Sequence, residues 1–559
     1  MKRYFCILLI FLTIDFAKAS PLHERVYVQT DKHLYLAGEP ILIKILTTDT
    51  ELIPLTFSKV AYLELVNDSI SQIQIKIELT NGIGTGLILL PANFLTGYYR
   101  LIAYTQFMRN EGVDVFFEKN IAVLNTFQHG SQPDEKETAV ITSSTAISTE
   151  KITNMVSLQS NKTTYTTRER GELTLNGLPE NIHTLSVSIA GKDFVPVSES
   201  DMLLFRKNQT KISTEFSGAF LPEYEGHIIT GKIIDNQTED IEIDETLLTA
   251  GLAFPTGNGI RFFMGQKNET GNVRFFTSEI SGTKEIATVV YNTGGKYRID
   301  IQSPFVTRFV PKQMPALHID SAYYEQLLAR SVTLQVFRYF SEESSVSQNF
   351  QESYFKMKPT RSYLLDEYTR FATMREVFTE FIEGARFRRN SGKQELSVLT
   401  QTGDRYNYGT MPLVLLDGTP ISDHDAIYNY DPLSVEQINI YYGPYLMGGY
   451  QFDGIVELLT YRRLHQDLNE ATQFLVYEGP QLPYRLDTPD YLEEKNRSSR
   501  VPDARHTLLW NPDVRADEKN TIRLPFDTSD LTGEFQATVE GITKDGENIF
   551  ATLFFKVER

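Results

Sequence analysis

Cysteine is nearly absent from the 559 residues, and Cys6 is the only one. It lies in an apolar run, Phe5 to Ile14, that follows two basic residues and precedes the small-residue sequence Ala17-Lys18-Ala19. This order is typical of a secretory signal sequence, which we predict over residues 1–19 with cleavage near Ala19. The mature chain then has no cysteine and no disulfide bond, so its stability comes from its hydrophobic cores. We expect an exported protein of the cell envelope, either periplasmic or associated with the outer membrane.

The sequence also lacks the usual marks of a membrane span, of nucleic-acid binding and of catalysis. No later apolar run approaches the roughly 18 residues of a spanning helix. The 72 acidic and 54 basic residues give a net charge of −18, which disfavours nucleic acid as a partner. The nine histidines are scattered, and there is no His-Glu-x-x-His, no Gly-x-Ser-x-Gly and no phosphate loop. We therefore predict no catalytic residue, no metal ligand and no cofactor, and a protein that is not an enzyme.

One short segment could still suggest a metal or an acid–base site. Asp423-His424-Asp425 is the only place where two carboxylates flank an imidazole. Residues adjacent in a turn usually point apart and are solvated. We therefore favour a structural role for this segment.

What the chain does contain is the composition of packed β-sheets, with 35 Phe, 29 Tyr and 41% hydrophobic residues. Val26 to Val123 predicts a series of short strands, in which every second residue from Ile41 to Ile45 is isoleucine. An ungapped comparison of Val26–Ile45 with Val156–Leu175 pairs Val with Val, Gln with Gln, Lys with Lys, Tyr with Tyr and Glu with Glu. The two stretches form a diverged internal repeat, so a second β-sandwich is predicted.

Further along the chain, helical and mixed patterns appear. Short strands broken by Gly and Asn-Thr turns fill Gly226 to Phe305, and apolar residues at helical spacing predict a helix over Ser321 to Tyr339. Thr373 and Glu376 form a capping box for a second helix that ends before Gly384.

An α/β pattern follows the second helix. A strand over Leu413 to Leu416 leads into an Asp417-Gly418 turn, and a strand over Val435 to Tyr441 contains Glu436. A glycine-rich loop is predicted from Tyr442 to Gly454, where another strand begins.

Three resemblances follow from these motifs. The segments VYVQTDKHLYLAGEPI and LTGYYRLIAYTQFMRN resemble the macroglobulin-type β-sandwich of α2-macroglobulin-like proteins and of Bacteroidetes envelope proteins, and the second repeat resembles the next domain of that kind. Residues 223–312 resemble the carboxypeptidase-regulatory-like sandwich. The Asp-Gly strand, the Ser434-to-Ile440 strand and the glycine-rich element resemble, in that order, the plug domain of TonB-dependent outer-membrane receptors.

The resemblances also have limits. In the receptor family the plug lies inside a barrel of about 22 strands, and the residues after Arg463 are too few to form one. We therefore expect a plug-like domain without its barrel. Thioester-bearing macroglobulins need a cysteine that the mature chain lacks, so covalent trapping is excluded.

The predicted fold class is mainly β and multidomain, with tandem β-sandwiches followed by an α/β plug-like domain and a C-terminal β-sandwich segment. The predicted divisions are a signal sequence (1–19), a macroglobulin-type sandwich (24–126), a linker (127–152), a second macroglobulin-type sandwich (153–222), a carboxypeptidase-regulatory-like sandwich that is either separate or inserted (223–312), a helical connector (313–349), the plug-like domain (350–465) and a C-terminal β-sandwich (466–559).

The glycine-rich stretch is our candidate contact surface. Its glycines permit positive φ, and its aromatic residues offer large contact area with few torsions to freeze. The predicted partner-binding residues are Tyr442, Gly443, Tyr445, Gly448, Gly449, Tyr450 and Phe452. The predicted structural residues of the plug motif are Asp417, Gly418, Glu436 and Gly454. A second cluster, Arg386, Arg388 and Arg389 beside Phe387, is either a solvated strand edge or a patch for an acidic partner.

These observations predict a non-enzymatic binding or scaffold protein of the envelope that docks on an outer-membrane or cell-surface protein through its plug-like domain. Membrane association would then come through partners, with no nucleic acid involved. Two alternatives stay open. One is an accessory component of TonB-dependent outer-membrane transport, and the other is a thioester-less macroglobulin-like endopeptidase inhibitor with Gly130 to Glu150 as its cleavable segment.

Overall fold

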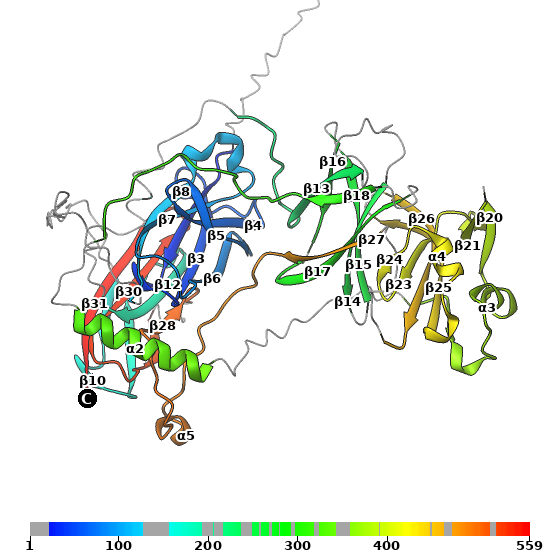
Figure 1. Ribbon diagram of the computed structural model, residues 1–559. Helices are drawn as coiled ribbons and strands as arrows, with labels where there is room; N and C mark the ends of the chain where they lie inside the picture. Colours follow the sequence, from blue (N-terminus) through cyan, green and yellow to red (C-terminus); the bar gives the residue numbers. More distant parts are fainter. Residues whose placement is uncertain are drawn as a thin grey trace, which may run out of the picture.

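The computed structural model describes residues 22–126, 156–192, 205, 216–235, 249–256, 259–267, 271–278, 280–291, 297–317, 324–341, 358–390, 392–447, 450–462, 472–514 and 521–559. The predicted signal sequence, the linker and the cleavable segment lie outside these residues. The chain is mainly β and multidomain, as predicted. Figure 1 shows an elongated molecule with the sandwiches at one end and a separate sheet in the middle. At the other end lies the region of the predicted plug-like domain, which we call the plug-like module after that prediction.

The first sandwich consists of two sheets, as the strand pattern predicts. One sheet has the order β1-β3-β6 and the other has the order β2-β8-β7-β4-β5. Their strands are β1 (Arg25–Thr30), β2 (Leu34–Leu36), β3 (Pro40–Thr48), β4 (Val60–Asn67), β5 (Ile70–Glu78), β6 (Ile83–Leu89), β7 (Gly97–Tyr104) and β8 (Phe117–Leu124). Two short 3-10 turns, η1 (Met108–Glu111) and η2 (Val113–Val115), lie between β7 and β8.

Strand β3 is buried on both faces, because one face meets the five-stranded sheet and the other meets the second sandwich. Lys44 is therefore enclosed, and burial lowers the pKa of its ammonium group to about 7 in spite of the nearby carboxylates of Asp513 and Glu540. The two sandwiches are joined by polar contacts as well: Tyr27 donates a hydrogen bond of 2.6 Å to Glu540, and Thr507 donates one of 2.6 Å to Asp31. They form one body.

The second sandwich is assembled from two distant parts of the chain. Its sheets have the orders β9-β11-β29 and β10-β31-β30-β12-β28. The strands from the second repeat are β9 (Ser157–Ser160), β10 (Thr164–Thr166), β11 (Arg170–Asn176) and β12 (Ile182–Gly191). Those from the C-terminal part are β28 (Thr507–Asn511), β29 (Ile522–Asp527), β30 (Gly533–Thr543) and β31 (Asn548–Glu558). The red strands of Figure 1 thus lie beside cyan β12.

This arrangement corrects two predicted domains. Residues 153–222 and 466–559 do not form two sandwiches, because their strands pair with one another and share one hydrophobic core. Everything between β12 and β28 is an insertion into the second sandwich. Within the described residues of each half only two strands pair with each other, and an isolated two-stranded sheet is marginally stable at best.

The internal repeat is confirmed by topology and by hydrogen bonds. The strand orders of the two sandwiches correspond one to one, including the parallel pairs β2 with β8 and β10 with β31. The hydroxyl of Tyr35 donates to Asp31 at 2.7 Å, and that of Tyr165 donates to Asn161 at 2.5 Å. The Asx side chain accepts a backbone N–H from the returning strand in each copy, at 3.1 Å and 2.9 Å. The shared Tyr therefore fixes the same turn twice.

The predicted helical connector also covers the first sandwich. Helix α2 (Tyr324–Ser341) packs Leu327 against β2 and β8, and its Arg330 donates hydrogen bonds of 2.7 Å and 2.5 Å to Glu39. Burial alone would raise the pKa of Glu39, but the Arg330 guanidinium and the Lys32 ammonium hold it well below its ordinary value. In the second copy the matching positions are polar and exposed, for example Thr164, and no helix among the described residues covers them.

A seven-stranded sheet forms the middle of the molecule, with the order β18-β13-β16-β15-β14-β17-β27. Its strands are β13 (Ile228–Asp235), β14 (Thr249–Thr256), β15 (Gly259–Lys267), β16 (Asn272–Phe276), β17 (Thr283–Tyr291), β18 (Tyr297–Ile301) and β27 (Thr472–Glu478). The region for which a carboxypeptidase-regulatory-like sandwich was predicted is thus inserted in the second sandwich. It also takes β27 from the predicted C-terminal sandwich, which is a further correction.

The plug-like module is a sheet with the order β20-β21-β25-β26-β23-β24, to which β19 and β22 are added at β25 and β21. Its strands are β19 (Arg361–Leu364), β20 (Ala385–Asn390), β21 (Lys393–Thr402), β22 (Arg405–Gly409), β23 (Leu413–Leu416), β24 (Thr419–Pro420), β25 (Val435–Met447) and β26 (Tyr450–Thr460). The helices and 3-10 turns are α3 (Met374–Glu380), α4 (His424–Tyr428), η4 (Leu365–Glu367) and η5 (Pro432–Ser434). Thr373 and Glu376 form the predicted capping box of α3.

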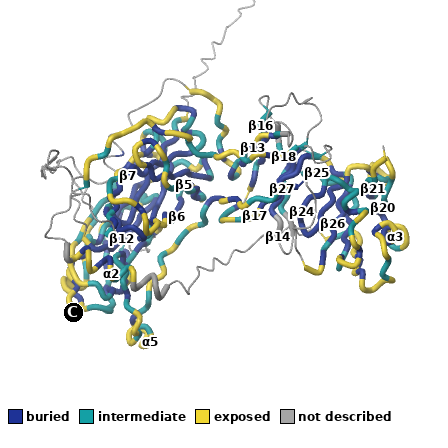
Figure 2. Tube along the Cα trace, in the orientation of Figure 1, coloured by how far each residue is buried: buried dark blue, intermediate teal, exposed yellow. Residues whose placement is uncertain are grey.

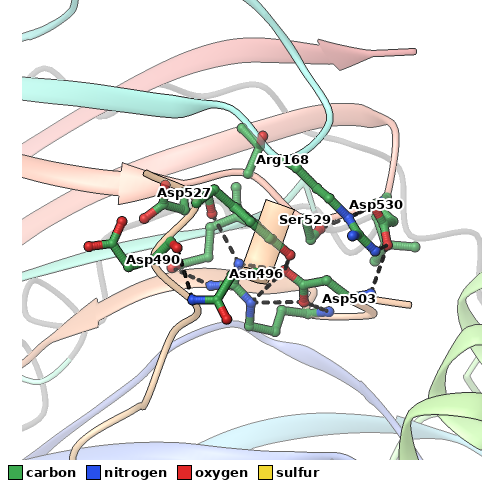
Figure 3. Close-up of polar contacts among 12 residues, drawn as sticks. Arg168, Asp490, Asn496, Asp503, Asp527, Ser529 and Asp530 are labelled. Carbon is green, nitrogen blue, oxygen red and sulfur yellow. Dashed lines mark hydrogen bonds and ion pairs between the residues drawn. The ribbon is translucent and has the colours of Figure 1, made fainter. Parts of the chain in front are cut away.

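The segment that follows β27 contains α5 (Glu494–Arg497) and is held on the second sandwich by arginine–aspartate contacts (Figure 3). Arg168 pairs with both oxygens of Asp530 at 2.7 Å and donates to the carbonyl of Ser499 at 2.6 Å. Arg170 pairs with Asp527 and Asp490 at 2.6 Å and 2.8 Å. These carboxylates are engaged by guanidinium groups, so we assign this cluster a structural role.

Candidate functional site in the arm

We call the seven-stranded sheet and the plug-like module together the arm. Figure 2 shows that buried residues line the centre of each sheet, whereas exposed residues gather at the far end of the arm around α3. The sequence-predicted residues of the module are described first. The contacts that join the arm to the body follow.

The Asp417-Gly418 turn between β23 and β24 is confirmed. Both residues have positive φ, 46° and 80°, as a tight two-residue turn requires. The Asp417 carboxylate accepts the backbone N–H and the hydroxyl of Thr460 at 2.7 Å and 2.5 Å. Asp417 therefore fastens the turn to the end of β26, in keeping with its predicted structural role.

The predicted glycine-rich loop is wrong as a loop. Strand β25 continues to Met447 and β26 begins at Tyr450, so the stretch is a long β-hairpin. Gly448 and Gly449 lie outside the described residues. Gly443 and Gly454 are needed for close approach, because an added Cβ would lie 2.2 Å from the Asp453 carbonyl oxygen and 2.4 Å from a methyl group of Val398, respectively. Positive φ, the reason given from the sequence, applies to neither of them.

Most of the predicted contact aromatics face the chain's own middle sheet. Phe452 is only 2% exposed and packs edge-on against Phe262. Tyr445 and Tyr450 are partly buried against the same cluster, to which β14, β15 and β17 contribute Ala253, Met264 and Ala287. This cluster joins the two parts of the arm. A partner-binding role for these aromatics stays a prediction, and the burial of Phe452 opposes it.

Other predicted residues lie elsewhere on the hairpin. Tyr442 packs against the opposite core, where an added Cβ on Gly384 would meet its ring. Glu436 lies at the start of β25 and is partly buried. Leu446, which was not singled out from the sequence, is 76% exposed and is the most exposed large apolar residue of the hairpin.

The arginine cluster lies on β20, at the end of the sheet. The guanidinium of Arg386 lies 3.7 Å from the ring centre of Tyr408, and that of Arg388 lies 5.4 Å from it. Phe387 points to the other face and packs against Phe378. The cluster is thus a strand edge with an ordered cationic face.

Asp423-His424-Asp425 has the structural role that we favoured. Asp423 caps α4, Asp425 accepts the N–H of Gln394 at 2.8 Å, and Nδ1 of His424 accepts the N–H of Leu396 at 3.1 Å. Asp425 and His424 thus hold α4 against β21, and Asp423 stabilises the start of the helix. Burial lowers the pKa of His424 to about 4, although nearby carboxylates oppose the shift.

We expect the plug-like module to lose stability as the pH falls from 6.5 towards 4. Unfolded His424 binds a proton near pH 6.5, whereas the folded residue resists protonation until about pH 4. Folding is therefore disfavoured by up to about 2 kcal/mol at pH 4.5. Urea unfolding at pH 7 and 4.5 should show this loss in the wild type and less of it in His424→Asn. Equal losses in both proteins would contradict the assignment.

A buried polar network lies where the chain enters the arm before β13 and leaves it after β27, a place that we call the neck. This network was not predicted from the sequence. Glu223, which precedes β13, accepts hydrogen bonds from Tyr62 of β4 at 2.9 Å and from the backbone N–H of Ile228 at 2.8 Å. Nδ1 of His227 lies 2.8 Å from the same carboxylate. The Glu223 carboxylate thus joins the segment that leads into β13 to the first sandwich.

The returning strand joins the same network. Tyr477 of β27 lies 2.5 Å from Nε2 of His227, and Lys76 of β5 donates to the Tyr477 hydroxyl at 3.3 Å. Burial lowers the pKa of His227, so the ring is neutral, with Nδ1–H donating to Glu223 and Nε2 accepting from Tyr477. The network is buried, as the low exposure of Glu223, His227 and Tyr62 shows. It holds the chain segments that enter and leave the arm against the first sandwich. No sequence signal links its members, which are up to 415 residues apart along the chain.

Within the described residues, no group of three or more His, Cys, Asp or Glu is placed to hold a metal ion. Nor does any helix in the described ranges combine the length and apolar character that crossing a membrane requires.

Comparison with known proteins finds similar solved structures. No family model and no curated protein matches the chain. Solved structures that match include Salmonella α2-macroglobulin reacted with methylamine, at TM-score 0.25 and 9% identity over 96% of this chain and 39% of that one. Native Escherichia coli α2-macroglobulin matches at TM-score 0.24 and 12% identity over 97% and 40%. The adhesin InvE of Yersinia pseudotuberculosis matches at TM-score 0.13 and 9% identity over 49% and 57%.

The chain spans about two fifths of the length of the macroglobulins that it matches. At these TM-scores the overlays carry no argument about function. What the fold itself defines is a multidomain, mainly β protein in which an arm is inserted into the second of two repeated sandwiches.

Proposed function

We propose that the chain is a non-enzymatic binding protein of the cell envelope that presents its plug-like module to an outer-membrane protein. The observation that carries the proposal is the position of the module at the end of the arm, away from the body (Figure 1). A buried aromatic cluster holds it to the middle sheet, and the neck network holds that sheet to the body. These contacts keep the module in a fixed position away from the body, where it is accessible to a partner protein. The sequence resemblance to receptor plugs favours an outer-membrane partner.

Photo-crosslinking in cells tests this proposal. A photoreactive amino acid would replace Leu446 or Tyr406 in the module and, as controls, Ile70 or Leu89 in the body, all of them exposed. We expect crosslinks to an outer-membrane protein from the module positions only. Crosslinks from the body alone, or none at all, would contradict the proposal.

The same experiment separates the two alternatives. A crosslink to a transporter would favour the accessory role in TonB-dependent transport. A crosslink to a protease from the body, with none from the module, would favour the inhibitor. The cleavable segment of that inhibitor, Gly130 to Glu150, lies outside the described residues.

A further inference from the structure

Strand β20 is the last strand of its sheet, at the far end of the arm. It pairs with β21 on one side, and within the described residues no strand pairs with the other side of Ala385 to Arg389. Unpaired backbone groups on such an edge accept another extended chain. The edge is firmly placed, because Phe387 packs against Phe378 at 5.0 Å and Tyr428 at 5.1 Å between ring centres.

The outer face of this edge is basic. Arg386 and Arg388 are two residues apart and therefore point to the same side, where both lie over Tyr408 of β22. The buried side chains of Leu396 and Val398 in β21 mark the opposite side as the core. A cationic face is unusual in a chain with net charge −18.

Some, but not all, of the other arginines in the described part of the chain pair with a carboxylate. Nine have a carboxylate within 4.0 Å, namely Arg25, Arg100, Arg168, Arg170, Arg330, Arg361, Arg370, Arg505 and Arg523. Within the described residues, Arg386 and Arg388 have no such ion pair, and their guanidinium groups lie over the ring of Tyr408. Ser397, which is directly across from Arg386 in β21, is 1% exposed, and its hydroxyl has no hydrogen-bond partner within the described residues. The carboxylate of Glu395, directly across from Arg388, accepts hydrogen bonds from Asn390 at 3.0 Å and 3.2 Å, so its partner within the described residues is the amide and not either guanidinium group.

We propose that the edge of β20 binds an extended acidic segment of a partner protein by strand addition, with Arg386 and Arg388 pairing with carboxylates on alternate residues. The inference rests on the proposed function and names the surface that would perform it. Arginines on an edge repel a second copy of the same edge, so they oppose self-association and favour an acidic strand. Guanidinium groups pair with carboxylates through two parallel hydrogen bonds.

The test uses the full chain and a fluorescent peptide of alternating acidic and apolar residues, Asp-Val-Glu-Val-Asp-Val-Glu. We expect binding that weakens as salt rises, and hydrogen exchange that slows at β20 when the peptide is present. Arg386→Ala/Arg388→Ala should weaken binding by about tenfold or more. Lys495→Ala/Arg500→Ala removes the same charge from exposed positions on the body and should leave binding unchanged.

A charge-reversed variant distinguishes a loss of binding from a folding defect. Arg386→Glu/Arg388→Glu should no longer bind the acidic peptide and should instead bind a peptide in which lysine replaces each Asp and Glu. The proposal is overturned if the arginine variants bind the acidic peptide as the wild type does, or if the wild type binds vesicles of anionic phospholipid but not the peptide. If crosslinks from Leu446 and Tyr406 persist in Arg386→Ala/Arg388→Ala, the proposed function stands and only the assigned edge fails.

Discussion

Truncation after Arg505, which deletes β28 to β31, should unfold residues 156–191. Strand β12 lies between β28 and β30, and β11 pairs along its length with β29. Without these partners the second repeat keeps only short strands and an uncovered apolar face, which cannot fold alone. Hydrogen exchange read by mass spectrometry should show fast exchange in β9 to β12 and continued protection in the first sandwich. Protected β9 to β12 would mean that the second repeat folds by itself.

A point substitution tests the same core in the intact chain. Phe526 of β29 is buried and packs edge-on against Tyr165 of the second repeat, with ring centres 5.3 Å apart. Phe526→Ala is expected to destabilise the sandwich by about 3–5 kcal/mol. Phe554→Ala is the control, because that ring is half exposed on β31 and should change stability by less than about 1 kcal/mol. Equal effects would show that Phe526 is not part of a shared core.

The sequence predicted local structure well where one turn or one cap decides it. The Tyr35 and Tyr165 turns, the Asp417-Gly418 turn and the Thr373 cap all depend on residues within a few positions of each other. Their hydrogen bonds form in the same way wherever the segment is placed. This is why a gapless comparison of two short stretches could identify a repeated domain.

The sequence failed where distant segments meet. Pairing of Leu173 with Leu524 leaves no mark in the local pattern, so one sandwich was predicted as two domains. Phe452 and Tyr450 looked like an exposed aromatic loop because their partners, such as Phe262, belong to another region of the chain. Lys44 shows the same limit, since a lysine in an alternating strand predicts a solvent face and β3 has none. Composition and spacing describe one segment at a time, whereas burial depends on which segments are neighbours.

Glu223→Ala is expected to release the arm from the body and to lower stability by about 3–5 kcal/mol. The substitution leaves the Tyr62 hydroxyl, the His227 ring and the Ile228 N–H without their shared acceptor in a buried place, and each unpaired group costs about 1–3 kcal/mol. The losses are not additive because the groups share one site. We expect faster hydrogen exchange in β13 and β27 and a broader range of molecular dimensions in small-angle scattering.

The control for this prediction lies two residues further along the chain. Glu225 is exposed, so Glu225→Ala removes the same charge without touching the network and should change stability by about 0.5 kcal/mol at most. Glu223→Gln should fall between the two variants, because its amide oxygen still accepts one hydrogen bond but carries no charge. If Glu223→Ala unfolds at the same urea concentration as Glu225→Ala, with unchanged exchange in β13 and β27, the neck network does not hold the arm. The aromatic core around Tyr62, Tyr104 and Phe305 would then be the attachment.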